Sequence, residues 1–560
     1  MIVIYDKDDV IELNNINQSK KIKIFLFSPG LENYLKNKKF FEIYNYDINF
    51  NSLIQKKIII NSLKIHKEYE KNLNFLNKLN NGLRENIFNI FFVSIFSYIY
   101  LIESLKKFNE LSFIEKGKII NFDNFEAFIV AFIEKINKKE KQGFFEYIKP
   151  KKKTWFSIIF IKLNNFFCKI NNGEKSLIVG SLLAKKIFKK SKKIHSIIEF
   201  KSQNDFKIKH LLNNIIFTLG FYFNKKKFFF FPDNYGYNNN EELKKSIETF
   251  VKNINHPYIN YFKKTIVTSL YKYCNNQLQI ENSINIFLKN NFVKNIFVDQ
   301  LRFGVATVLA NLANSKGVKV TLVPHGSISV PSDMFSEFLL KISSRGLVRS
   351  KLANYVVSQS KISYESIKYF DKNIKIIKSR PILYGKTKID RNLNKNKFVF
   401  LHASTPKSLS KWPYIYENYN EYVFNIKSLI NEISVLNNVE LIIRFREGPE
   451  CSIENFKKEI DLQAHKFIKI SKNKNFFEDL KISNCLISFS STAIEETLGL
   501  NKRVLIYSNY KKYKHINFNL QKDSIIYSNQ SNIRKILKKI IKENLILDND
   551  IFWNDDNFFI

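Results

Sequence analysis

Short apolar runs alternate with longer amphipathic stretches through the second half of the chain. Residues 295–299 and 318–323 are apolar runs of strand length, and the stretch 303–315 between them has helix-forming composition. Gly317 follows that stretch, and a glycine commonly ends a helix. The order strand, helix, strand with short connections predicts a β-α-β unit of a parallel sheet.

The alternation continues on both sides of a polar stretch at residues 386–397. Further strands are expected at residues 176–181, 228–231, 355–358, 374–377, 398–401, 439–445, 467–470, 485–489 and 504–507, and helices at 182–188, 239–291, 361–370, 422–436 and 531–543. Residues 21–30 look like a first strand ending in a turn and, together with residues 6–11, suggest an α/β start. Residues 53–170 have mostly helical character instead.

The length of 560 residues exceeds the roughly 250–300 at which a single core stops growing. We therefore expect an α/β protein with two Rossmann-like domains and a largely helical insertion in the N-terminal half. The expected division is a first domain at 1–385 with the insertion at about 53–170, a linker at 386–397, a second domain at 398–545 and a tail at 546–560.

The formal charge of +39 points first to anionic partners. The lysines are scattered, however, within a chain rich in Lys, Asn, Ile and Phe and poor in Arg, Ala, Gly and Pro. A solvated surface, an anionic membrane surface or a polyanionic substrate explains them better than nucleic acid, and no nucleic acid partner is expected.

Cysteine usage and apolar runs bear on the compartment. Four cysteines without a CxxC pair indicate a reducing environment without disulfides or structural zinc. The first ten residues carry acids early, unlike a signal peptide. The uncharged run at 86–102 is slightly shorter than the ~20 residues that span a bilayer, which favours a buried or membrane-surface helix. We expect a cytoplasmic protein, with peripheral contact to the inner face of the cytoplasmic membrane as an option.

Candidate chemistry gathers where predicted strands end, which is where open α/β sheets bind ligands. His325 lies in the turn at 324–327. In a functional role it would act as general base on an acceptor hydroxyl or donate a hydrogen bond to phosphate. The alternative is a turn histidine bonded to backbone. Gly326 lets backbone approach a ligand, or only fits a turn. Ser327 completes this turn.

A hydroxyl-rich turn precedes the predicted helix at 493–500. Ser490, Ser491 and Thr492 place hydroxyls and free backbone N–H groups where a helix N-terminus favours an anion. Glu496, about one turn into the helix, is within reach of a sugar hydroxyl. The alternative is an ordinary capped helix.

Other strand ends add cations and hydroxyls. Arg444 and Arg446 share a face if the strand at 439–445 continues, and there they would neutralise a leaving phosphate or form surface ion pairs. The strand at 398–401 is followed by His402, Ser404 and Thr405. They either line the same site or only cap the neighbouring backbone. Asp299 and Arg302, after another strand, are either acceptor-side contacts or a structural ion pair.

Two segments resemble a known family. VTLVPHGS at 320–327 resembles the strand and "HG" motif of some bacterial capsule and surface-polysaccharide transferases, and SSTAIEETLGLNKRVLIYS at 490–508 resembles the donor phosphate and ribose motif of GT-B glycosyltransferases. CDP-glycerol glycerophosphotransferase-like enzymes are similar too. The resemblance covers about 296–507, and it departs from the family where Asn501 replaces Gly and Arg503 replaces Pro.

The resemblance implies a GT-B-like arrangement, with two Rossmann-like domains facing a cleft, the acceptor side at 1–385 and the nucleotide-donor side at 398–545. It also implies a glycosyltransferase that moves a sugar from a nucleotide-activated donor to a surface polysaccharide or glycolipid, without a catalytic metal and without a cofactor. His325 would be the base, and Gly326, Ser327, His402, Ser404, Thr405, Arg444, Arg446, Ser490, Ser491, Thr492 and Glu496 would bind the donor. Glycerol-phosphate transfer, nucleotide-sugar epimerisation and noncatalytic binding of membrane or polyanion remain alternatives.

Overall fold

The computed structural model describes most of the chain. The described residues are 1–16, 21–26, 31–45, 52–76, 79, 81–139, 174–190, 197–202, 227–231, 240–302, 304–328, 331, 333–384, 397–404, 415, 417, 419–447, 452–473, 475–489, 491–508, 524–543, 547 and 550–554. Thr405, Ser490 and the predicted linker up to residue 396 lie outside them.

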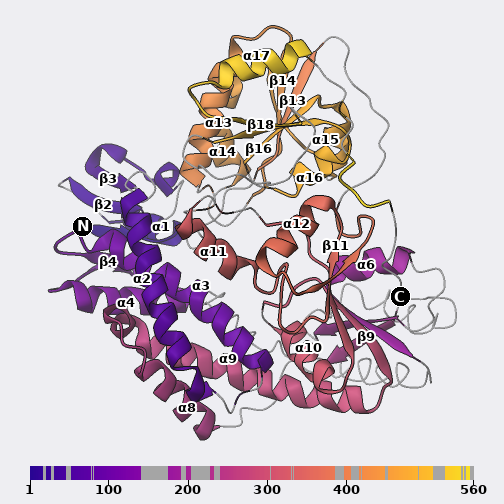
Figure 1. Ribbon diagram of the computed structural model, residues 1–560. Helices are drawn as coiled ribbons and strands as arrows, with labels where there is room; N and C mark the ends of the chain where they lie inside the picture. The colour runs from indigo at the N-terminus through magenta and orange to yellow at the C-terminus, as the bar shows by residue number, and fades with distance from the viewer. Residues whose placement is uncertain are drawn as a thin grey trace, which may run out of the picture.

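Three sheets organise these residues (Figure 1). The central sheet has the strand order β12-β11-β10-β9-β6-β7-β8, and the C-terminal sheet has the order β15-β14-β13-β16-β17-β18. Within each sheet the first strand in the chain lies beside the fourth, and the next two extend to the other side, which is the Rossmann order. The expected α/β class with two Rossmann-like sheets is confirmed.

The central sheet is parallel throughout. Its strands are β6 (Lys175–Val179), β7 (Ile197–Ser202), β8 (Lys227–Phe231), β9 (Val293–Val298), β10 (Lys319–Leu322), β11 (Tyr355–Ser358) and β12 (Lys375–Lys378), and its helices are α6 (Ser181–Lys190), α10 (Val305–Ser315), α11 (Met334–Ser344) and α12 (Lys361–Phe370). Gly317, with φ of +72°, follows the end of α10 as predicted. Capping boxes begin α11 at Asp333 and α12 at Ser360.

The C-terminal sheet is also parallel. Its strands are β13 (Phe398–His402), β14 (Val439–Ile443), β15 (Ile468–Ile470), β16 (Cys485–Ser488), β17 (Arg503–Tyr507) and β18 (Ile525–Ser528), and its helices are α13 (Tyr419–Ser434), α14 (Ile453–Glu459), α15 (Phe476–Ile482), α16 (Ala493–Leu498) and α17 (Ile533–Glu543). β14 ends at Ile443, so the prediction of a strand running to residue 445 is wrong.

A third sheet precedes these two; the strand expected at 21–30 is one of its five strands, and the other four were not expected. Its strands are β1 (Ile2–Ile4), β2 (Ile22–Leu26), β3 (Phe41–Asn45), β4 (Ser112–Glu115) and β5 (Lys118–Asn121), and α1 (Lys7–Asn14) follows β1. The antiparallel pair of β4 and β5 corrects the helical interpretation of this part of the chain. Lys116 and Gly117 both have positive φ, the backbone that a two-residue hairpin turn requires.

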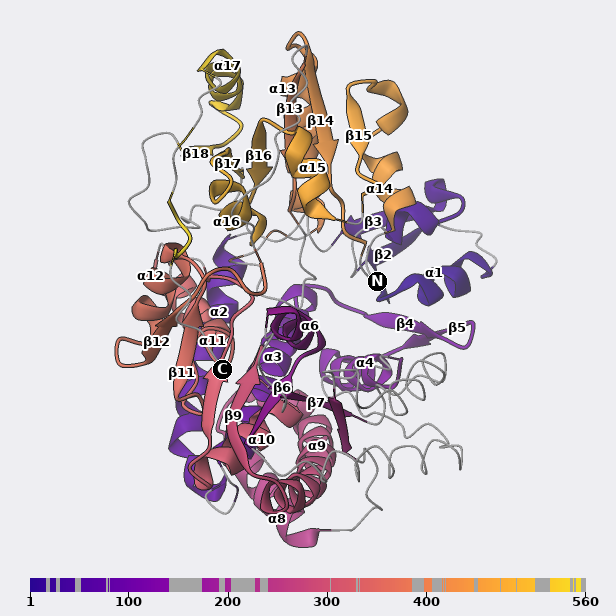
Figure 2. The same cartoon turned by 90° about the vertical axis from the view of Figure 1, so that its right-hand side faces the viewer.

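Long helices fill the space between the N-terminal and central sheets (Figures 1 and 2). They are α2 (Ser52–Lys71), α3 (Asn81–Leu105), α4 (Phe125–Lys139), α8 (Glu241–Lys252) and α9 (Pro257–Lys289). The apolar run expected to form a buried or membrane-surface helix lies in α3, where Phe91, Ile95 and Ile99 are fully buried. Among the described residues, no helix combines the length and apolarity needed to cross a membrane.

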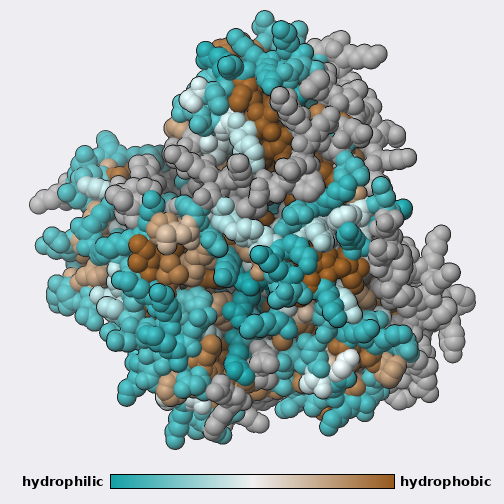
Figure 3. Space-filling view, in the orientation of Figure 1, coloured by the Kyte–Doolittle hydropathy of each residue, from teal (hydrophilic) through white to brown (hydrophobic). Residues whose placement is uncertain are grey.

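Side chains alternate between two cores on either side of the central sheet. On β9, Ile296 and Val298 pack into the core made with α3, α9 and α10, whereas Phe297 faces a second core. That second core continues without a break into the C-terminal sheet, where it includes Leu401 and Leu486. The two sheets therefore share buried apolar surface. The outer face in Figure 3 is mostly hydrophilic, with apolar side chains in small separate groups.

Residues 550–554 join the two sheets a second time, and we call this segment the clasp. The backbone N–H of Lys361, the first residue of α12, donates to the Ile551 carbonyl, and Trp553 Nε1 donates to Oγ of Ser358, the last residue of β11. Phe552 lies against Gly499 beside the C-terminal sheet, so closely that a Cβ on Gly499 would be 1.9 Å from its ring. The chain thus crosses from the central to the C-terminal sheet and returns.

Candidate active site

The turn after β10 contacts the start of α16. A Cβ placed on Gly326 would lie 2.4 Å from Thr492 Cγ2, so the two segments touch where residue 326 has no side chain. Gly326 and Thr492 are 166 residues apart in the sequence, and their segments follow strands of different sheets. The structure therefore brings together two of the segments that the sequence marked as candidates.

His325 and Asp299 face each other at the carboxyl edge of the central sheet. His325 Nε2 lies 3.5 Å from Asp299 Oδ2, and the His325 side chain is 49% exposed while that of Asp299 is 15% exposed. β9 and β6 are neighbours at the point where the strand order reverses, and Asp299 follows β9. Ligands of doubly wound sheets bind at this point.

Gly180 fixes the position of Asp299. Gly180 follows β6 with φ of +118°, and a Cβ there would lie 2.3 Å from Asp299 Oδ2. The carboxylate therefore lies directly over the backbone that begins α6, where the positive end of the helix dipole stabilises an anion. An exposed imidazole beside a held carboxylate can accept a proton and keep the resulting charge paired.

Glu495 of α16 links the two sheets. Its Oε1 accepts hydrogen bonds from the Ser327 backbone N–H at 3.1 Å and the Ser327 hydroxyl at 2.5 Å. Its Oε2 accepts from the hydroxyls of Ser360 and Tyr384, the latter at 3.1 Å. The carboxylate is fully buried, and all four donors come from the central-sheet side of the junction.

Tyr384 is held as a neutral donor in this cluster. Burial, followed by the nearby Glu495 carboxylate, raises the pKa of Tyr384 well above its usual range. The hydroxyl therefore stays protonated and donates a hydrogen bond to Glu495. Sequence reasoning chose Glu496 for a ligand contact, but the structure places its neighbour at the junction.

The turn before α16 is only partly described. Ser491 Oγ accepts a hydrogen bond from the Ala493 N–H at 3.2 Å, Thr492 is exposed and makes no side-chain cap, and Glu496 is half-buried. Ser490 lies outside the described residues. The helix itself has six residues. Binding of a donor phosphate by this turn stays a prediction.

His402 and Ser404 lie deeper than a ligand-lining role suggests. His402 ends β13, is 5% exposed, and packs edge-on against Tyr422 with 5.5 Å between ring centroids. Burial lowers the pKa of His402 to about 3, so the ring is neutral at pH 7. Its Nδ1 has no hydrogen-bond partner among the described residues. Ser404 Oγ donates to the buried Glu417 at 3.5 Å.

Arg444 and Arg446 lie in irregular backbone after β14, so the premise that they share a strand face is wrong. Arg444 Nη1 donates to Asp479 Oδ2 at 2.7 Å and to the Asn473 carbonyl at 2.9 Å. This ion pair holds Arg444 against α15. Arg446 is exposed. Of the two arginines, Arg446 is therefore the better placed to meet a ligand from solution.

Lys502 is a buried cation that sequence reasoning left without a role. It follows α16, is 7% exposed, and its ammonium donates to the carbonyls of Leu480, Lys481 and Ser483 at the end of α15. A cation at a helix C-terminus is favoured by the helix dipole. Lys502 therefore fixes α15 beside α16. Within the described residues, no group of three or more His, Cys, Asp or Glu side chains is arranged to hold a metal.

Comparison with known proteins gives structural matches only. No protein-family model and no curated protein sequence matches the chain. Among solved structures, UDP-GlcNAc 2-epimerase from Neisseria meningitidis bound to UDP-GlcNAc is 11% identical, with 68% of this chain and 95% of that chain covered and a TM-score of 0.36.

Two further matches are of the same quality. MurG of Acinetobacter baumannii is 11% identical, with 67% and 92% coverage and a TM-score of 0.34. The wall teichoic acid polymerase TagF is 11% identical, with 72% and 90% coverage and a TM-score of 0.35. Likeness at these scores carries no assignment of function, which has to come from the residues at the junction of the two sheets.

Proposed function

We propose that this protein is a group transferase that moves a sugar from a nucleotide-activated donor to a hydroxyl of a surface polysaccharide or glycolipid. The observation that carries the proposal is the pair of His325 and Asp299, at the strand-order reversal of one Rossmann-like sheet and beside the contact with the other. Such an edge is the usual ligand site of each sheet, and here the two edges meet.

In the proposed reaction His325 accepts the proton of the acceptor hydroxyl while the oxygen bonds to the donor carbon. The bond from that carbon to the donor phosphate breaks, and the nucleoside diphosphate leaves with the electron pair. Asp299 keeps the imidazole in place and pairs with its charge after proton transfer. Arg446 and the turn at 491–492 are the proposed partners of the leaving phosphate, and no divalent metal is required.

Two assays test this proposal. A thermal-shift panel of CMP, CDP, UDP, GDP and dTDP, with EDTA or Mg²⁺, should find one nucleotide that raises the midpoint without metal, because binding to the folded state stabilises it. His325→Ala should keep that shift and lose about 10²–10⁴-fold in transfer rate. Tyr364→Phe, a half-exposed aromatic of α12, is the control.

Three outcomes would overturn the proposal. They are full turnover of His325→Ala, the absence of any nucleotide shift, and release of a free sugar without an acceptor, which would be epimerisation. Transfer of glycerol phosphate from a CDP donor would keep the site and the base but change the transferred group. Peripheral contact with the inner membrane face is part of the proposal only through a glycolipid acceptor.

A further inference from the structure

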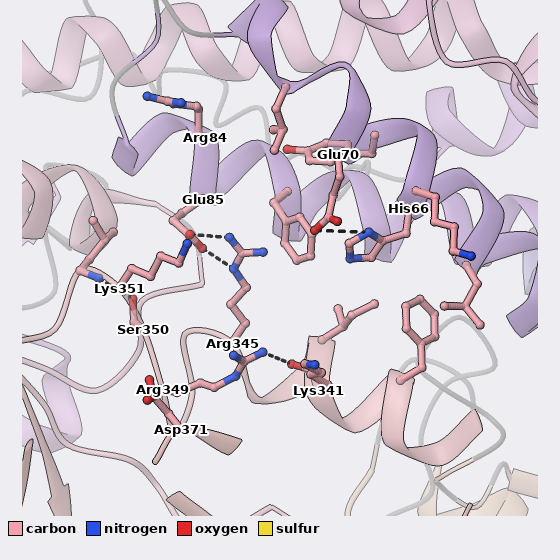
Figure 4. Close-up of a pocket in the computed structure, with 18 residues that line it drawn as sticks. His66, Glu70, Arg84, Glu85, Lys341, Arg345, Arg349, Ser350, Lys351 and Asp371 are labelled. Carbon is pink, nitrogen blue, oxygen red and sulfur yellow. Dashed lines mark hydrogen bonds and ion pairs between the residues drawn. The ribbon is translucent and has the colours of Figure 1, made fainter. Parts of the chain in front are cut away.

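A cavity lies among the helices, apart from the edge of the central sheet that carries His325. It has a volume of about 820 Å³ and lies between α2 and α3 on one side and α11 with residues 345–352 on the other (Figure 4). Ligand pockets have volumes of roughly 300–1,000 Å³. The cavity is therefore large enough for a small molecule and is made from elements that the transfer reaction does not use.

One part of the lining is apolar. It consists of Leu63, Leu73, Phe88, Phe338, Ile342 and Leu352. Phe88 and Phe338 come from α3 and α11, on opposite sides of the cavity. This part of the wall favours a hydrocarbon segment over a fully hydrated ligand.

Two arginines make a fixed part of the wall. Arg345 forms a bidentate ion pair with Glu85, with Nε 2.6 Å from Oε2, and its guanidinium lies 3.8 Å from the centre of the Phe88 ring. Arg349 donates to the Lys341 carbonyl at 2.7 Å and to Ser344 Oγ at 2.8 Å. Figure 4 shows Arg345 reaching toward Glu85 in the middle of the lining. These bonds hold the wall without filling the cavity.

Three lysines give the cavity an excess of positive charge. The lining holds six Lys and Arg side chains against three carboxylates, those of Glu70, Glu85 and Asp371. Lys67, Lys341 and Lys351 are exposed, and none has a carboxylate partner within the described residues. Lys67 comes from α2, Lys341 from α11 and Lys351 from the segment after it. Their ammonium groups are therefore available to an anion approaching from more than one side.

We propose that this cavity binds a phosphorylated amphiphile, with the phosphate at the exposed lysines of the lining and the apolar chain against Phe338. A lysine ammonium binds phosphate as a point charge. Several lysines therefore suit a ligand with the multiple negative charges of a phosphate ester better than a ligand with the single charge of a carboxylate. The proposal does not depend on the transfer reaction at His325.

His66 provides a reporter inside the cavity. Its ring lies 4.7 Å from Phe92 and 5.9 Å from Phe338, and its Nδ1 is 3.7 Å from Glu70 Oε1. Burial lowers the pKa of His66, Glu70 opposes that effect, and Arg345 and Lys341 add to it. An anion bound beside Lys341 adds negative charge near the ring and should raise the pKa of His66.

Calorimetric titration of the full chain with three probes tests the site. The probes are decyl phosphate below its micelle concentration, neutral decanol, and inorganic phosphate. Decyl phosphate should bind tightest, and raising the salt from 50 to 300 mM should weaken it by screening. Equal affinity for decanol would overturn the phosphate contact, and equal affinity for inorganic phosphate would overturn the amphiphile.

Matched variants locate the binding. Lys341→Ala/Lys351→Ala should weaken decyl phosphate about tenfold or more and leave decanol unchanged. The double variant Lys535→Ala/Lys538→Ala on α17 removes the same charge from exposed positions of the other domain and should change nothing. Full affinity of the cavity variant, or equal losses in the two variants, would overturn the proposal.

Two further readouts separate binding in the cavity from adsorption elsewhere. Phe338→Ala should weaken decyl phosphate and decanol alike, because both use the apolar wall. Proton NMR, with the His66 signal identified by its absence in His66→Gln, should show the pKa of His66 rising when decyl phosphate is added. An unchanged pKa at saturation would place the ligand elsewhere.

Discussion

Replacement of Glu495 by glutamine tests the junction between the central and C-terminal sheets. Each oxygen of the carboxylate accepts two hydrogen bonds, Oε1 from Ser327 and Oε2 from Ser360 and Tyr384. Glutamine has the same shape but only one oxygen, and its NH2 group cannot accept. Whichever way the amide is turned, two donors on one side lose their acceptor.

The size of the effect follows from those two bonds. A hydrogen bond to a charged group contributes about 1.5–3 kcal/mol. Both hydrogen bonds lost in Glu495→Gln are bonds to a buried carboxylate. The substitution should therefore cost the closed junction about 3 kcal/mol, at the lower end of the sum. That is roughly a hundredfold in the equilibrium between closed and open junction.

Hydrogen exchange followed by mass spectrometry measures this opening directly. The Ser327 N–H donates to Glu495, so its exchange reports on the junction, whereas strands far from it report on global unfolding. Glu495→Gln should speed exchange in a peptide covering 319–328 by about a hundredfold relative to the wild type. Exchange in β1 and β2 should not change.

A control and a refuting outcome complete the experiment. Glu365→Gln makes the same chemical change at an exposed position of α12 and should leave exchange as in the wild type. If Glu495→Gln exchanged like the control, the four hydrogen bonds would not hold the two sheets together. If exchange rose equally in β1 and β2, the effect would be on global stability and not on the junction.

Three more predictions concern the same region. Gly326→Ala should destabilise the closed junction by about 1–3 kcal/mol, because the new Cβ would contact Thr492 Cγ2. Thr492→Ser removes that methyl group, and adding it to Gly326→Ala should restore most of the lost stability in a double-mutant cycle measured by thermal unfolding. Gly180→Ala should displace Asp299, lowering the transfer rate about a hundredfold with nucleotide affinity unchanged; an unchanged rate would contradict the role of that carboxylate. The pKa of His402 is about 3 when folded and ~6.5 when unfolded, so its contribution to stability is complete above pH 6.5 and falls as the pH drops toward 3. By pH 5 the wild type should lose about 2 kcal/mol of unfolding free energy that His402→Gln does not lose. Urea unfolding at pH 7 and pH 5 measures this, and an equal loss in the two proteins would refute the prediction.

The parallel sheets were predictable because each strand is a short apolar run with a helix after it. Residues 318–323 and the helix before them illustrate this, since both faces of the strand are buried and the run needs no alternation. Of the N-terminal sheet only β2 was predicted, as the strand at 21–30. The other four strands are three to five residues long in a chain rich in Ile and Phe everywhere, so their pattern does not stand out.

The candidate site was predictable in its segments but not in its pairs. His325 and Thr492 were found from strand ends, whereas the role of Glu495 depends on which side of a six-residue helix faces another sheet. So short a helix has too little periodicity to distinguish Glu495 from Glu496. The cavity lined by Phe88 and Phe338 was out of reach, because its walls come from segments about 250 residues apart.

The clasp determines how the two Rossmann-like halves can move. The chain leaves the central sheet after Tyr384 and is back beside it at Asp550, where Lys361 Nζ donates to Asp550 Oδ2 at 2.8 Å. Phe552 meanwhile lies against Gly499 of the other half. Parting the two halves therefore requires the clasp to lose either its hydrogen bonds to Ser358 and Lys361 or its contact with Gly499, in addition to the bonds of Glu495.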